Sequence, residues 1–163
     1  MPTKTQQLQI RVTPQQKAAL KRQARAAGSD VSSYVLRLLL PAGRDRFADL
    51  LQLLQRATDH RYALAALNDF LHECPPTMLA DAVGVADVGA LSPYLQNYVA
   101  AMVELTADSK GVEPPAWVGN VTPLASPRFA TPMKSLRMHL LRSAPVPFKR
   151  RNIFVDASVG SRV

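Results

Sequence analysis

The first residues of the chain alternate between apolar and polar side chains. Within residues 7–13 the apolar positions are Leu8, Ile10 and Val12, and the polar positions are Gln7, Gln9 and Arg11. This period of two predicts a β-strand with one buried face and one wet face. No second strand is predicted nearby, so the backbone donors and acceptors of this strand need a partner from elsewhere.

After this strand the spacing of apolar residues becomes that of a helix. Thr13, Pro14 and Gln16 have the types and spacing of an N-cap, a proline at the first helical position and a capping-box partner. The helix is predicted to end at Gly28, and a second, apolar helix to follow Asp30. Because so small a unit cannot bury its apolar faces alone, we expect a twofold homodimer in which the strand pairs antiparallel with its own copy.

The segment with this order of elements is "LQIRVTPQQKAALKRQARAAGSDVSSYVLRLLL", residues 8–40. It resembles the ribbon-helix-helix DNA-binding domain of bacterial repressors and antitoxins. The resemblance concerns the N-terminal quarter of the chain. It implies an intertwined homodimer that inserts a two-stranded ribbon into the major groove of double-stranded DNA.

The wet face of such a ribbon would meet the edges of the bases. Glutamine can bond both polar edge atoms of adenine, and arginine those of guanine. We therefore predict base contacts by Gln7, Gln9 and Arg11. The alternative is a solvated sheet face in a module that only dimerises.

Phosphate contacts are predicted at two places in the same domain. Lys4 lies just before the strand, and the backbone amides of Val31 and Ser32 lie at the start of the second helix. Amides at a helix N-terminus direct a positive dipole end toward an anion.

The rest of the chain is predicted to be mainly α-helical. Apolar spacing predicts a small helical domain over residues 44–110, whose last helix has Ser92 as its N-cap and Pro93 at its first position. Residues 111–163 form a proline-rich, extended segment, then a short helix, a basic turn and a strand around Ile153–Val155. The fold class is thus mainly α: a ribbon-helix-helix domain over residues 1–43, a helical domain, and an extended, partly β tail.

Charge divides the chain in the same way. Residues 1–43 contain seven Lys or Arg residues and one acidic residue, a net charge of +6. Residues 44–113 contain five basic and ten acidic residues, a net charge of −5. Residues 114–163 contain eight basic residues and one acidic residue, a net charge of +7. Two basic ends favour a polyanionic or acidic partner, although basic surface can also serve solubility alone.

The basic tail also contains many apolar residues, too many for a disordered arm. We predict that it binds a protein partner, with Phe148 or Phe154 as a buried anchor and with Arg150 and Arg151 as steering and rim contacts. Two alternatives are a second DNA contact and a tail that completes the core of the helical domain.

The sequence contains no recognised catalytic or cofactor motif. Cys74 is the single cysteine, which excludes an internal disulfide, and its spacing from His72 matches no metal site. We therefore expect no catalytic residue, no metal and no cofactor. The absence of an apolar leader or membrane span favours a cytoplasmic protein.

These patterns predict a sequence-specific, DNA-binding transcriptional regulator. Our first hypothesis is an antitoxin that represses its own operon and binds a protein partner, possibly a toxin, through its C-terminal region. The second is a DNA-binding accessory protein of plasmid maintenance or conjugation. The third, from another class, is an enzyme with its site in residues 44–163 and an N-terminal module that only dimerises it.

Overall fold

The computed structural model describes Gln9, Gly28 and residues 11–26, 30–32, 34–35 and 42–159 of the chain. The chain divides into two compact units, Met1–Leu40 and Pro41–Val163, which are considered separately below. The second unit contains both the helical segment and the tail that the sequence analysis treated as two regions.

The first unit contains helix α1, Pro14–Ala26, which begins and ends where the sequence predicted. The backbone N–H of Thr13 donates to Oε1 of Gln16 over 2.9 Å, and the N–H of Gln16 donates to Oγ1 of Thr13 over 3.3 Å. This reciprocal pair confirms the capping box. At the other end Gly28 has a positive φ of 62° and donates its N–H to the carbonyl of Arg25, so it stops the helix as predicted.

Replacing Thr13 with Ala should destabilise α1 by about 1 kcal/mol, because the first turn loses its side-chain acceptor. The measurement is hydrogen exchange of the α1 amides in the full chain, which should become faster. Gln15→Ala is the control, since Gln15 is an exposed neighbour in the same turn. Equal exchange rates in the two variants would contradict the capping role.

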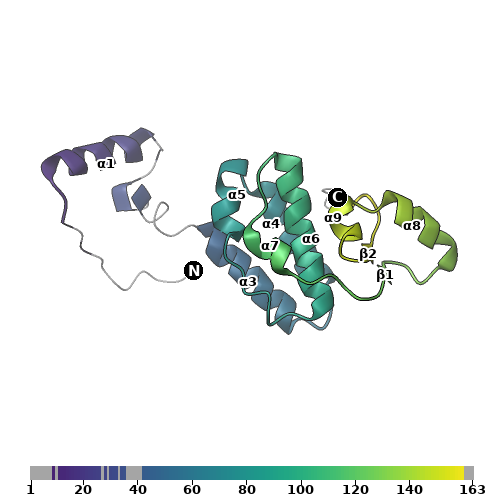
Figure 1. The fold of residues 1–163 in the computed structure, drawn as a ribbon. Coiled ribbons are helices and arrows are strands. Elements are labelled where there is room, and N and C mark those ends of the chain that lie inside the picture. The colour runs from purple at the N-terminus through teal and green to yellow at the C-terminus, as the bar shows by residue number, and fades with distance from the viewer. Residues whose placement is uncertain are drawn as a thin grey trace. The chain divides into compact units, whose positions relative to one another are not determined.

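The second unit is mainly helical (Figure 1). Its first five helices are α3 (Ala42–Arg56), α4 (Arg61–Glu73), α5 (Pro76–Val83), α6 (Pro93–Lys110) and α7 (Ala116–Asn120). They are followed by strand β1 (Arg128–Phe129), the 3₁₀-helix η1 (Lys134–Leu136), helices α8 (Arg137–Ser143) and α9 (Val146–Lys149), and strand β2 (Ile153–Phe154). None of the helices that the structure describes is both long and apolar enough to cross a membrane.

Helix α6 is the centre of this unit and contacts α4, α5, α7 and α9. Oγ of Ser92 accepts the N–H of Leu95 over 3.4 Å, Pro93 opens the helix, and Gly111, with φ 64°, ends it. The N-cap and the first helical position are as predicted. Because α6 has neighbours on several sides, its buried residues extend around the helix rather than along one stripe.

Helices α3 and α5 pack very closely at Gly43. A Cβ atom added to Gly43 would lie 2.8 Å from the Cβ of Ala82 in α5, so only glycine allows this approach. Further along α3, Phe47, Leu51 and Leu54 are buried, in agreement with the helical apolar spacing expected from residue 44 onward. The helix begins at Ala42, two residues before the start predicted for the helical domain.

The tail contributes to the same core as the helices. Val118, Phe148, Ile153 and Val155 belong to the hydrophobic cluster that also contains the buried residues of α3 to α6. The predicted strand near Ile153 is present as β2. Its partner β1 lies parallel to it, with Arg128 opposite Ile153 and Phe129 opposite Phe154, in the segment that was expected to be a loop.

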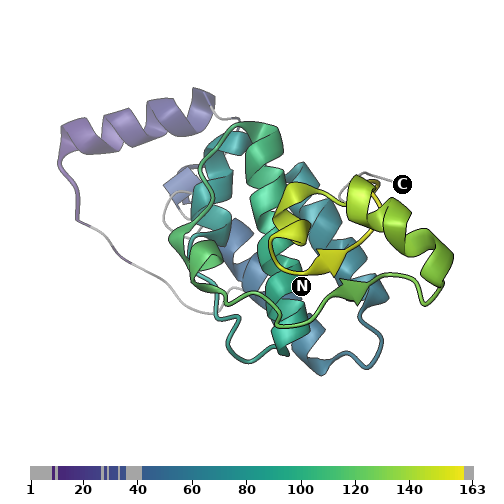
Figure 2. The same cartoon turned by 45° about the vertical axis from the view of Figure 1, so that its right-hand side comes forward.

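A second, smaller cluster lies under helix α8. It contains Leu140, Ala144 and Phe154, with the half-buried ring of Phe129 packed against them. Figures 1 and 2 show α8 at the edge of the unit, beyond the two strands. Residues 130–144 therefore form an excursion from β1 that has a small core of its own.

Candidate nucleic-acid interface

The predicted ribbon precedes α1, and the structure describes Gln9 and residues 11–13 of it. Gln9, Arg11 and Val12 are exposed and lie outside any helix or strand. Lys4 and Gln7, the other predicted DNA contacts of this segment, lie outside the described residues. The structure holds one copy of the chain, so the pairing of two copies stays a prediction.

Helix α1 presents a cationic surface. Ala24 is fully buried, whereas the helix's four basic side chains are exposed. These are Lys17, Lys21, Arg22 and Arg25. The sequence from Met1 to Ser29 contains no acid, so no carboxylate of this stretch offsets Arg11 and the four basic side chains of α1. Such a surface attracts a polyanion without regard to its sequence.

Val31 and Ser32 are helical, as the sequence predicted for the residues after Asp30. The N–H of Tyr34 donates to the carbonyl of Asp30 over 2.9 Å, which is the first bond of this helical turn. Ser32 is exposed and Val31 is half-buried. Their contact with phosphate stays a prediction.

Of the four residues predicted to bind a protein partner, three are buried inside their own chain. Phe148 is fully buried in the main core, and Phe154 is buried in the smaller cluster under α8. Arg151 is buried as well, and only Arg150 is exposed. Phe148, Phe154 and Arg151 are therefore occupied inside their own chain, as in the alternative in which the tail completes the core.

Both arginines bind a single carboxylate in α6. Nη1 of Arg150 lies 2.8 Å from Oε1 of Glu104, and Nη1 of Arg151 lies 2.7 Å from Oε2. Arg151 also donates to the carbonyls of Val118 and Pro147. The sequence analysis missed Glu104, although a lone acid in the apolar run "YVAAMVELTA" is a signal for a buried ion pair.

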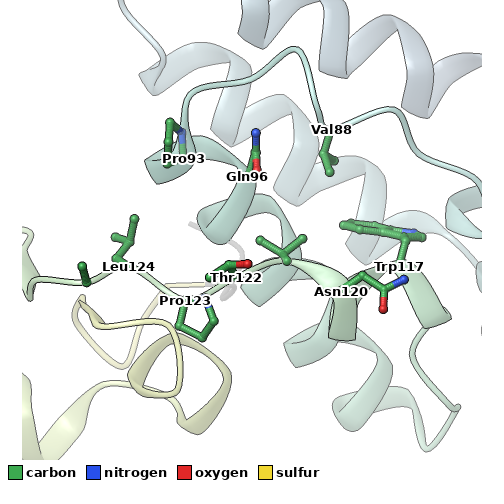
Figure 3. A pocket seen from close by; sticks show the side chains of 10 residues that line it. Val88, Pro93, Gln96, Trp117, Asn120, Thr122, Pro123 and Leu124 are labelled. Atoms are coloured by element: carbon green, nitrogen blue, oxygen red, sulfur yellow. The ribbon is translucent and has the colours of Figure 1, made fainter.

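A hollow of about 480 Å³ lies beside the start of α6 (Figure 3). It is lined by Val88, Pro93, Gln96, Trp117 and residues 120–125. The Gln96 amide donates to the carbonyl of Leu91 over 2.8 Å, and the Trp117 indole N–H donates to the carbonyl of Val83 over 2.7 Å. The lining includes no titratable side chain; its polar side chains include the amides of Gln96 and Asn120 and the hydroxyl of Thr122.

No three His, Cys, Asp or Glu residues in the part of the chain that the structure describes lie close enough together to hold a metal ion. Cys74 is buried, and this burial raises the pKa of its thiol, which disfavours the nucleophilic thiolate.

Comparison with known proteins gives a family match for the N-terminal part of the chain. Residues 2–59 match the family model of NikA-like proteins, which is described as mobilization protein NikA. The matched range includes all described residues of the first unit and helix α3 of the second. No curated protein and no solved structure matches the chain.

Proposed function

We propose that this chain is a DNA-binding accessory protein of plasmid mobilisation, which contacts double-stranded DNA through its first unit. The observation that carries the proposal is the match of residues 2–59 to a mobilization protein family. That match favours our second hypothesis over the antitoxin, which no comparison supports. The exposed cations of α1 suit the same role, because mobilisation acts on DNA.

We propose further that the chain binds DNA as a homodimer. In one copy, the apolar side chain of Val12 is exposed next to the polar Arg11, as expected for a strand whose partner is another molecule. Pairing two ribbons would bury Val12 and direct two sets of Gln7, Gln9 and Arg11 toward the bases. We keep the proposal that the protein is not an enzyme.

The experiment begins with the full chain and a library of random DNA duplexes. Repeated binding and amplification should enrich one sequence, with approximate twofold symmetry because the reader is a dimer. Sedimentation of the free protein at micromolar concentration should show a dimer. Failure to enrich any duplex would refute specific DNA recognition.

Arg11→Ala should weaken binding to the enriched duplex by about 1–3 kcal/mol, because it removes a bidentate contact to a base. Lys4→Ala should instead weaken binding to all duplexes alike and make the salt dependence shallower. Arg56→Ala is the matched control, since Arg56 is an exposed arginine at the end of α3. Unchanged affinity of the Arg11 variant would mean that another surface reads the sequence.

A further inference from the structure

Helix α8 has apolar side chains on two opposite sides. Leu140 and Ala144 face inward to the small cluster that they form with Phe154. Met138 is two residues from Leu140, about 200° around the helix, and 67% of its surface is exposed. Leu141, one turn after Met138, is 39% exposed. Met138 and Leu141 therefore form an apolar pair on the outer side of α8, and no other part of the described chain covers them fully.

Three more exposed apolar side chains lie close to α8 along the chain. Met133 precedes η1, Leu136 ends it and Val146 begins α9. Exposed apolar residues that occur singly are ordinary, whereas several within one short segment favour an interaction surface. Methionine and leucine also suit such a surface because they adapt to an apolar groove and anchor helices in it.

The charged side chains on either side of the pair along the chain are basic. Lys134 and Arg142 are each four residues from Met138 and are exposed, and neither side chain forms an ion pair within the described part of the chain. Residues 114–155 contain no Asp or Glu. Asp156, the next acid along the chain, accepts the N–H of Ser158 and lies 3.6 Å from Nε2 of His139.

We propose that α8 docks through Met138 and Leu141 into a groove on a partner protein that has an apolar floor and carboxylates at its rim. The floor would cover the apolar pair, and the carboxylates would pair with Lys134 and Arg142. DNA fits this surface less well, because its phosphates offer nothing to the apolar side chains. The proposal does not depend on DNA binding by the first unit.

This surface replaces the one expected from sequence. Phe148 and Phe154 cannot be anchors without leaving the core, whereas Met138 and Leu141 are already exposed. The proposed surface again combines an apolar anchor with basic rim contacts, but these side chains come from α8 and η1 and not from residues 148–154.

The test uses the full chain and a displayed library of small helical domains with one randomised face. Selected domains should be enriched in large apolar residues together with Asp and Glu. Their affinity should fall at least tenfold for Met138→Ser/Leu141→Ser. It should fall severalfold for Lys134→Gln/Arg142→Gln at low salt and hardly at all at high salt. Tyr62→Ser is the matched control, because Tyr62 is 83% exposed in α4.

Three results would overturn the proposal. Selected domains without acidic enrichment, or with equal affinity for the α8 variant and the unchanged chain, would show that α8 is not the docking surface. A lower affinity of Met138→Ser/Leu141→Ser for DNA would make this face a nucleic-acid contact. A lower sedimenting mass of that variant would show that the surface is covered by a second copy. Circular dichroism of each variant confirms that the second unit remains folded.

Discussion

Replacing Phe148 with Ala should lower the free energy of unfolding of the second unit by about 3–5 kcal/mol. The ring is fully buried, and Tyr98 packs against it edge-on with centroids 5.1 Å apart. Truncation would remove apolar contacts and leave a cavity between α6 and α9, which contact each other. Trp117 is the single tryptophan of the chain, so its fluorescence during urea titration reports this unit.

Val146→Ala is the matched control for Phe148→Ala. Val146 lies in the same short helix but is exposed, so its truncation should change stability by no more than about 0.5 kcal/mol. The opposite result for Phe148, unchanged stability together with a lost protein partner, would restore its predicted role as an anchor.

Replacing Glu104 with Ala should lower the free energy of unfolding of the second unit by about 3–5 kcal/mol, because it leaves the buried Arg151 without its counter-charge. The cost comes mainly from the unpaired guanidinium rather than from a lost attraction. Arg150→Ala should cost no more than about 1 kcal/mol, since the Arg150 side chain is 67% exposed. Urea titration followed by Trp117 fluorescence measures both variants.

A double variant separates the two sources of this cost. Glu104→Met/Arg151→Met removes both buried charges and keeps apolar volume, so it should regain most of the stability that Glu104→Ala loses. A double variant as unstable as Glu104→Ala would show that the loss does not come from the unpaired guanidinium of Arg151.

Features set by neighbouring residues were predicted well from sequence. The cap formed by Thr13 and Gln16 and the start of α6 at Ser92 and Pro93 involve residues within one helical turn. The same holds for the apolar face of α3, which follows from a simple period. These signals are local, so they need no knowledge of the rest of the chain.

Features set by distant residues were not predicted. Strand β1 has two residues, too few to show a period, and it exists because β2 lies beside it. The run Lys149–Arg151 looked like exposed surface because its partner, Glu104, lies in another helix. The sequence therefore indicated basic and apolar side chains that need partners, without showing that Glu104 of the same chain pairs with Arg150 and Arg151.

The excursion of residues 130–144 affects which substitutions the fold can accept during evolution. Its small cluster is separate from the main core, and residues 130–144 lie between β1 and the start of α9. Substitutions on the outer side of α8 therefore leave the packing around α6 untouched. The outer face of α8 can therefore diverge between related chains while the main core stays the same.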